Sequence, residues 1–340
     1  MRVSSNLWFK MFACCVLVRG YASSLIYDVQ RKLFYTISNE AFNLLKSAED
    51  QDMEALRSNI RYDHSFLDSF YKQFVDAELG FYTDEPWSYP SIDFTWHSPH
   101  TITNSIIEIS KQSDFSFGDI IDQLNELSCK AVQVRFLDNL SSSELNKYLD
   151  AFRLSRIKHL EIYLPYQTIQ PHKILYKKLE EEPRLFRIII YGCLEDKLIF
   201  SQATLGKAII EVKRNIQINN KETIKPERFS TNIESFTEAQ HYNLGLNRKV
   251  CIDRYGNIKN YIRHEKSFGS IKNIKIKDVI LTSGFSEKWD VSNDKIEKCR
   301  DCQYRYTCVS NSDVVEKNGK YYKTETCDFD PYNNKWNNVK

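Results

Sequence analysis

The amino-acid sequence predicts an α/β protein built from three parts. They are an N-terminal α+β unit over residues 1–100, a partial (β/α) barrel-like domain over 101–243, and a C-terminal cysteine-metal module over 244–340. Three observations support this division. A chain of 340 residues exceeds what one compact core usually needs. Strand and helix patterns alternate through its middle, and four of its nine cysteines follow residue 298.

Composition and charge exclude several classes of protein. The apolar fraction of 42% and aromatic fraction of 13% are typical of a folded globular chain. A net charge of +2 provides no field that would favour a nucleic-acid partner. No run of eighteen apolar residues occurs, so we expect no membrane partner. Residues 11–18 imitate a secretory signal only faintly, because Arg19 ends the run, and we expect a first strand and a cytoplasmic protein.

The N-terminal unit begins with β-rich runs. Residues 12–18, 24–28 and 32–37 predict strands, and Ser38 can cap the helix that follows. Helical spacing returns at Phe66, Phe70 and Phe74, whereas residues 80–100 are rich in aromatic residues and proline and predict a connector. The edge of such a sheet can accept an extended peptide as an added strand. The unit is therefore a candidate peptide-docking region, and an ordinary covered edge is the alternative.

The middle of the chain alternates between strand and helix. Strands are predicted at 105–110, 131–137, 159–164 and 185–191, and helices at 118–127, 141–152 and 174–179. Ser141 and Glu144 have the spacing of a capping box. Such alternation builds a parallel sheet through crossover helices. About four units occur where a complete barrel needs eight, which predicts a partial barrel or an open sheet. Residues 215–240 predict a polar linker.

The last part of the chain carries two hairpin signals and a cysteine motif. The hairpins are centred on residues 254–257 and 317–320. Cys299 and Cys302 form a CxxC pair, and Cys308 follows six positions later. The hairpin at residues 317–320 can bring Cys327 back beside these three cysteines. Four thiolates suit tetrahedral zinc or a four-cysteine iron–sulfur cluster, and the spacing does not separate the two. Two disulfides or reduced buried cysteines are the alternatives.

The segment 251–327 resembles a SPASM domain, which carries auxiliary clusters in many radical SAM peptide-modifying enzymes. The matching features are residues 254–257 (Arg-Tyr-Gly-Asn), residues 268–271 (Phe-Gly-Ser-Ile), Trp289 and the three cysteines 299, 302 and 308. The resemblance implies one [4Fe–4S] cluster on Cys299, Cys302, Cys308 and Cys327. Ser312 and Tyr261 stand where that family has cysteines of a first auxiliary cluster, so we expect that cluster to be absent and Cys251 to be a buried structural cysteine.

The radical SAM motif CxxxCxxC is missing. The loop after the first predicted barrel strand, residues 111–117, has no cysteine, and no two of the remaining cysteines, at 14, 15, 129 and 193, have the required spacing. We therefore expect no cleavage of S-adenosylmethionine. This combination, together with residues 12–31, resembles the SPASM-domain peptide maturases of grasp-with-spasm systems. The resemblance implies a ribosomal precursor peptide and an ATP-grasp ligase as partners.

Three function classes follow from these features. The chain is an accessory of ribosomal peptide modification, an enzyme that uses an auxiliary cluster for electron transfer, or a metal-stabilised interaction protein. No phosphate-binding glycine loop occurs. His97 and His100 near Asp93 are explained by a solvated connector rather than by a metal site. The sequence identifies no catalytic residue.

Overall fold

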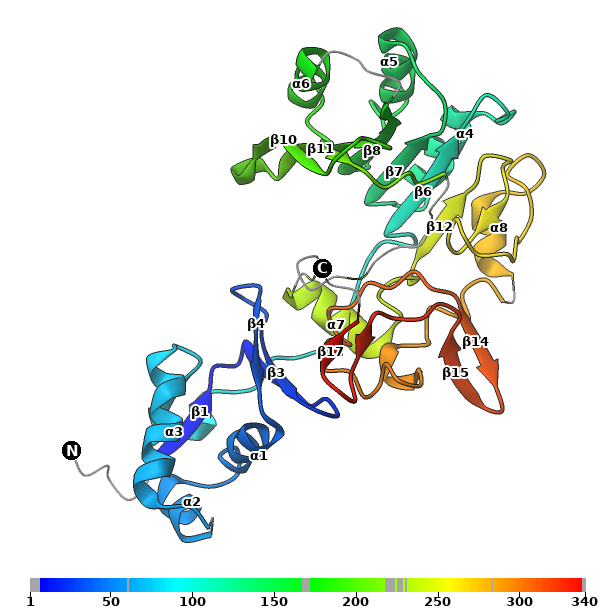
Figure 1. The fold of residues 1–340 in the computed structure, drawn as a ribbon. Helices are drawn as coiled ribbons and strands as arrows, with labels where there is room; N and C mark the ends of the chain where they lie inside the picture. Colours follow the sequence, from blue (N-terminus) through cyan, green and yellow to red (C-terminus); the bar gives the residue numbers. More distant parts are fainter. Residues whose placement is uncertain are drawn as a thin grey trace.

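The computed structural model describes residues 7–59, 61–166, 172–217, 224, 229, 231–282 and 284–337. Its centre is an eight-stranded sheet of order β10-β11-β9-β8-β7-β6-β12-β13 (Figure 1). The six inner strands run parallel, and the outermost strand on each side is antiparallel to its neighbour. The parallel-rich α/β sheet predicted from the sequence is confirmed, and it is open rather than closed into a barrel.

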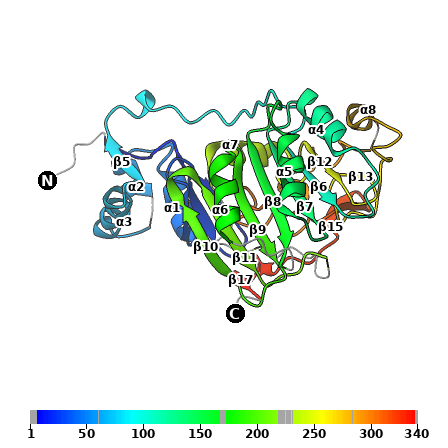
Figure 2. The ribbon, with the colours of Figure 1, turned by 90° about the horizontal axis from the view of Figure 1, so that it is seen from above.

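Three strand–helix units form the body of this sheet. They are β6 (Asn104–Ile109) with α4 (Phe117–Glu126), β7 (Ala131–Phe136) with α5 (Ser142–Asp150), and β8 (His159–Pro165) with α6 (His172–Glu181). β9 (Leu185–Tyr191) and the hairpin β10 (Lys197–Gln202) and β11 (Lys207–Val212) complete one side. The three helices lie on one face of the sheet (Figure 2). The predicted capping box of Ser141 and Glu144 is present at the start of α5.

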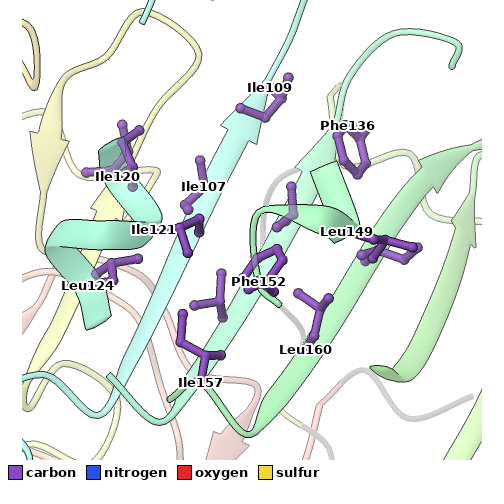
Figure 3. Close-up of a cluster of buried hydrophobic side chains, with 14 of the residues drawn as sticks. Ile107, Ile109, Ile120, Ile121, Leu124, Phe136, Leu149, Phe152, Ile157 and Leu160 are labelled. Carbon is purple, nitrogen blue, oxygen red and sulfur yellow. The ribbon is translucent and has the colours of Figure 1, made fainter. Parts of the chain in front are cut away.

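The main core lies between this face and its helices. Each parallel strand sends alternate apolar side chains toward the helices, because side chains of a strand alternate between its two faces. Ile107 and Ile109 of β6 meet Ile120, Ile121 and Leu124 of α4 (Figure 3). The other face of the sheet therefore remains available for polar side chains.

Beyond residue 243 the chain re-enters the central sheet. β12 (Lys249–Ile252) pairs in parallel with β6, and β13 (Ile258–Lys259) forms the predicted hairpin with it. The predicted linker over 215–240 is wrong in its last part, where α7 (Ile233–His241) begins at an Asn232 cap. Phe236 of this helix is buried against the N-terminal unit, and the linker reading overlooked that apolar contact. Residues 218–223, 225–228 and 230 of the linker lie outside the described residues.

The N-terminal unit contains a three-stranded sheet and three helices. β2 (Cys15–Val18), β3 (Ser24–Asp28) and β4 (Leu33–Ile37) are antiparallel, followed by α1 (Asn39–Ser47), α2 (Met53–Asn59) and α3 (His64–Asp76). Two predictions need correction. The strand expected at 12–18 starts only at Cys15, after a turn, and a separate β1 (Trp8–Met11) precedes it. β1 pairs with β5 (Gly80–Thr83), so the predicted connector begins with a strand.

The C-terminal part is built mostly from turns and short hairpins. α8 (Ile276–Leu281) packs beside α4, and β14 (Val314–Lys317) pairs with β15 (Lys320–Lys323) as predicted. β16 (Phe329–Asp330) and β17 (Lys335–Trp336) form a last small hairpin. Within the described residues, no helix is both long and apolar enough to cross a membrane.

Candidate metal centre

The cysteine knuckle, residues 299–308, is a series of tight turns. The Cys302 amide donates to the Cys299 carbonyl at 3.0 Å, and the Cys308 amide donates to the Tyr304 carbonyl at 3.0 Å. The Tyr304 amide also points at the Cys302 sulfur, at 3.4 Å. Turns of this kind bring sulfurs that are close in sequence to one side of the backbone.

The β14–β15 hairpin returns the fourth cysteine to the knuckle. Asn318 and Gly319 both have positive φ, of 53° and 71°, as a tight two-residue turn requires. The Glu297 amide donates a hydrogen bond to the Tyr321 carbonyl at 2.9 Å, which fixes the hairpin to the start of the knuckle. The chain leaving β15 then places Cys327 opposite the other three cysteines.

All four predicted ligands line one cavity of about 60 Å³: Cys299, Cys302, Cys308 and Cys327. Burial raises the pKa of Cys308 to about 12 and that of Cys302 well above its usual value, and the neighbouring thiols act in the same direction. Without a metal these thiols are therefore held protonated. A metal cation that displaces the protons would relieve the mutual repulsion of four thiolates.

Cationic side chains surround the cavity. Arg263 and Arg305 are paired with Glu325 and Asp294, each at 2.8 Å. Lys298 and Lys323 also line the cavity, and the Lys323 charge opposes the rise in the pKa of Cys299 and Cys308. A metal centre with four thiolate ligands carries net negative charge, which these lysines complement.

The sulfur spacing distinguishes two kinds of centre. Tetrahedral zinc with Zn–S bonds near 2.3 Å requires sulfurs about 3.8 Å apart. In the part of the chain that the structure describes, no three sulfurs of this cavity lie within 4.8 Å of one another. The one group of three candidate ligands that does so is Cys14, Cys15 and Asp28, in the N-terminal unit. A four-iron cluster binds each thiolate to a different iron and tolerates the wider spacing. The sulfurs of this cavity are therefore spaced more widely than those of a closed zinc site.

The N-terminal sheet packs directly on the knuckle. The Tyr27 hydroxyl donates to the Gln303 carbonyl at 2.6 Å, the Tyr21 amide donates to the Asp301 carbonyl at 2.8 Å, and Arg305 donates to the Arg19 carbonyl at 2.7 Å. Cys302 and Cys327 pack beside Val18, Leu25 and Tyr27 in a shared apolar cluster. Sequence reasoning missed this contact, because nothing in the spacing of either segment points to the other.

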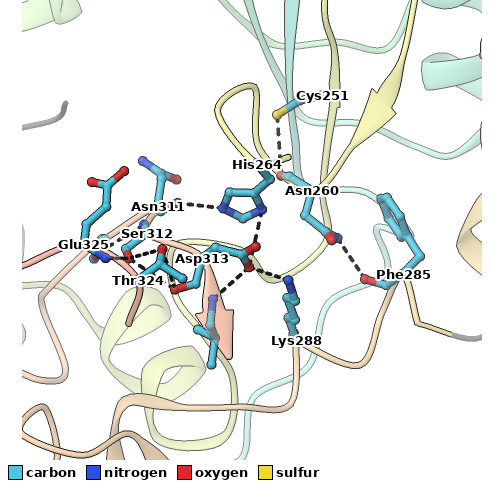
Figure 4. Close-up of polar contacts among 12 residues, drawn as sticks. Cys251, Asn260, His264, Phe285, Lys288, Asn311, Ser312, Asp313, Thr324 and Glu325 are labelled. Atoms are coloured by element: carbon cyan, nitrogen blue, oxygen red, sulfur yellow. Dashed lines mark hydrogen bonds and ion pairs between the residues drawn. The ribbon is translucent and has the colours of Figure 1, made fainter. Parts of the chain in front are cut away.

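Cys251, Tyr261 and Ser312, where the SPASM resemblance would place a first auxiliary cluster, lie among ordinary core and polar contacts. Cys251 and Tyr261 are buried in one apolar cluster, and the Cys251 thiol donates to the Asn260 carbonyl at 3.5 Å. Nearby, the Ser312 hydroxyl accepts the Glu325 amide at 3.0 Å. Asp313, which is ion-paired with Lys288 and lies 3.7 Å from the His264 ring, completes a polar network here (Figure 4).

The loop after β6 contains no thiol. Its Lys111 amide donates to Asp138 at 2.7 Å, and Asp114 forms an ion pair with Lys272 at 2.5 Å. Cys129 and Cys193 are buried in the main core. The connector histidines are also not gathered into a metal site, since the His100 ring contacts the Ser128 carbonyl at 2.6 Å and Asp93 bonds Thr95.

Two grooves lie outside the metal centre. The N-terminal groove, about 900 Å³, runs between β1, β2 and α1. Its wall includes Phe12, Phe81 and Tyr89, and the Phe81 ring contacts the Phe12 ring in a tilted arrangement and the Tyr89 ring edge to face. β1 pairs only with β5, and β2 only with β3, so each strand presents a free edge within the described chain. The second groove, about 540 Å³, lies on the helix-free face of the central sheet, where Gln133 bridges Glu161 and Arg135 at 2.7 and 2.6 Å.

No protein-family model matches this chain, and no curated protein matches it by sequence. Among solved structures, it is similar to SuiB of Streptococcus suis. SuiB bound to S-adenosylmethionine has 12% identity and a TM-score of 0.33, and SuiB bound to its precursor peptide SuiA has 10% identity and a TM-score of 0.37. Each comparison covers 90% of this chain and 94% of SuiB.

Proposed function

We propose that this protein assists the modification of a ribosomally made precursor peptide, in partnership with an ATP-grasp ligase and without cleaving S-adenosylmethionine. The observation that carries the proposal is the convergence of Cys299, Cys302, Cys308 and Cys327 on one cavity, in a chain whose loop 111–117 has no cysteine. These four cysteines are those that the SPASM resemblance assigns to a single [4Fe–4S] cluster.

The cluster would act mainly as a structural cross-link. When bound, an iron–sulfur cluster holds four thiolates in a fixed arrangement and can exchange single electrons. Residues of the chain would hold this cluster in place. The turns of the knuckle orient Cys299 and Cys302, and the β14–β15 hairpin presents Cys327. The positive charges of Lys298 and Lys323 offset the negative charge of the thiolates. The N-terminal sheet rests on this module through Tyr27. A formed centre therefore supports the docking unit.

The N-terminal groove supplies a place for the precursor. An extended peptide that adds to the edge of β1 or β2 gains backbone hydrogen bonds, and the aromatic wall of Phe12, Phe81 and Tyr89 can accept its apolar side chains. The polar groove on the central sheet can hold a following segment. Holding a peptide in a fixed position lowers the entropic cost of its meeting with a ligase.

The direct test co-expresses a precursor peptide and an ATP-grasp ligase with and without this protein. Loss of water from the precursor, measured by mass, is expected to require the protein. Equal modification in both cultures would exclude the accessory role. Formation of 5′-deoxyadenosine by the reduced, anaerobically purified protein would show that radical chemistry is present after all.

A second experiment tests the groove. Phe12→Ser removes an aromatic wall residue that is 38% exposed, and Phe66→Ser removes one that is 46% exposed on α3 of the same unit but outside the groove. Phe12→Ser is expected to weaken binding of the precursor's leader segment at least about tenfold, because it removes apolar contact area, whereas Phe66→Ser leaves binding unchanged. Equal affinity of both variants would place the docking site elsewhere.

A further inference from the structure

A second group of metal-binding side chains lies in the N-terminal unit, far in sequence from the cysteine knuckle. The Sγ atoms of Cys14 and Cys15 and a carboxylate oxygen of Asp28 all lie within 4.8 Å of one another. Cys15 is buried, Asp28 is completely buried, and Cys14 is half-buried. Of the residues that the structure describes, this is the group of three such ligands that comes together most closely.

The sheet register explains how these residues meet. Cys15 begins β2 and stands directly opposite Asp28, the last residue of β3. Opposed residues of an antiparallel pair have Cβ atoms about 4.5–5.5 Å apart. Cys14 still belongs to the turn before β2, so the strand rule that sends consecutive side chains to opposite faces does not apply to this pair. The Val29 amide fixes the turn by donating to the Cys14 carbonyl at 3.0 Å.

We propose that Cys14, Cys15 and Asp28 form a second metal site, which binds Zn²⁺ through two thiolates and one carboxylate. Zinc takes both sulfur and carboxylate ligands at 2.0–2.3 Å. Ligand atoms that lie within 4.8 Å of one another need only small side-chain rotations to reach the separation of about 3.8 Å in a tetrahedral site. The proposal does not depend on the proposed function.

Charge and remaining lone pairs agree with a divalent ion. Two thiolates and a carboxylate carry three negative charges, which Zn²⁺ and the adjacent Arg31 guanidinium together balance; Arg31 lies 3.3 Å from Asp28. Asp28 already accepts the amides of Gln30 and Arg31, at 3.2 and 2.8 Å. The Arg31 guanidinium donates a third bond, to the other carboxylate oxygen. A carboxylate has about four acceptor positions, so these three bonds leave one for a metal.

The site borders the N-terminal groove. Cys15 lies in the groove wall together with Ala13 and Val16. Three protein ligands leave one position of a tetrahedral zinc ion for water or another ligand, as in zinc sites that are not closed. A peptide docked in the groove would lie beside Cys15.

The test counts metals on the full-length protein. After anaerobic purification, loading with Zn²⁺ and desalting, zinc and iron are measured for the wild type, Cys14→Ser, Cys15→Ser and the control Cys193→Ser, which alters a buried cysteine of the central domain. We expect Cys14→Ser and Cys15→Ser each to lose one zinc ion per chain with iron unchanged, and Cys193→Ser to match the wild type. Equal zinc in all four folded proteins would overturn the proposal.

A measurement on the unaltered protein covers the case in which a variant does not fold. Peptide mass spectrometry follows alkylation of Cys14 and Cys15 by iodoacetamide, with Zn²⁺ and with Zn²⁺ plus chelator. Zinc is expected to slow alkylation of Cys14, the more exposed of the two thiols, at least about tenfold, since a thiolate bound to a metal is no longer a free nucleophile. Alkylation of Cys14 at the same rate under both conditions would reject the site.

Discussion

At the scale of single residues, the neighbours of a cysteine separate a candidate ligand from a core cysteine. Cys129 and Cys251 are buried, whereas the knuckle cysteines are half-buried, and each of the two buried thiols lies in an apolar cluster and donates to one backbone carbonyl. Cys302 and Cys308 instead face other thiols across a cavity. The neighbours of a thiol therefore indicate its role.

This difference predicts opposite effects of two alanine substitutions. Cys308→Ala should lose most of the bound iron and loosen residues 245–335, because folding of a small metal module is coupled to metal binding. Cys251→Ala should keep the metal and lower the free energy of unfolding by about 1 kcal/mol, since it removes one buried sulfur. Iron and sulfide analysis with hydrogen exchange measures both. If Cys251 proves necessary for the metal and Cys327 does not, the ligand set is wrong.

Cys129 makes the alkaline stability of the central domain depend on pH. Burial raises the pKa of its thiol from 9.0 to about 12. Its contribution to stability is complete below pH 9 and is lost as the pH rises toward 12, because the unfolded chain ionises first. Between pH 8 and pH 10, urea unfolding should show the wild type losing about 1 kcal/mol more than Cys129→Ala. Parallel losses in the two proteins would contradict this expectation.

At the scale of elements, short turns position the proposed metal ligands. The β14–β15 hairpin has only four residues in each strand, and its return depends on Asn318 and Gly319, both with positive φ. A Cβ on Gly319 would meet no atom within 4 Å. The turn therefore requires glycine for its backbone conformation and not for space.

Gly319→Val is expected to strain this turn by about 1–2 kcal/mol, because a β-branched residue disfavours left-handed backbone. The displaced hairpin should release metal faster to a chelator. Asn318→Gly is the matched control, since glycine adopts positive φ without strain. Metal release, followed by loss of visible absorbance, should accelerate for Gly319→Val and not for Asn318→Gly; the same rate for both would show that the turn does not hold Cys327.

At the scale of the whole molecule, the first and last parts of the chain form one contact. Tyr27 is completely buried against the knuckle, and Gly20 approaches so closely that a Cβ there would lie 2.9 Å from Gln303. The N-terminal unit thus packs against the proposed metal module (Figure 1). Peptide docking and metal binding are expected to be coupled through this contact.

Tyr27→Phe tests the coupling. It leaves the Gln303 carbonyl without its donor, which should cost about 1–3 kcal/mol and reduce hydrogen-exchange protection of residues 299–308. Tyr71→Phe is a close control, because Tyr71 is equally buried and donates to the Leu44 carbonyl at 2.8 Å inside the N-terminal unit. Only Tyr27→Phe should hasten metal loss to a chelator. Equal loss from both variants would mean that the contact does not stabilise the centre.

Local patterns in the sequence predicted most of the elements. The alternation at 131–137, the capping box at Ser141 and the Asn318-Gly319 turn each depend on neighbours a few residues away, and each occurs as predicted. The four cysteines 299, 302, 308 and 327 were chosen from their spacing, and the structure places them around one cavity. α2, the β10–β11 hairpin and the strand β5 were missed, because their patterns are short and weak.

Only the tertiary structure decided which distant segments meet. The packing of Tyr27 on the knuckle joins residues more than 270 positions apart, as does the opposition of Gly20 and Gln303. Cys14, Cys15 and Asp28 have no metal-binding spacing, and the antiparallel register of β2 and β3 alone makes them neighbours. The tertiary structure alone also shows that β12, from the C-terminal part of the chain, pairs with β6 and extends the central sheet. Such contacts depend on how whole elements pack, and no local pattern of side chains encodes them.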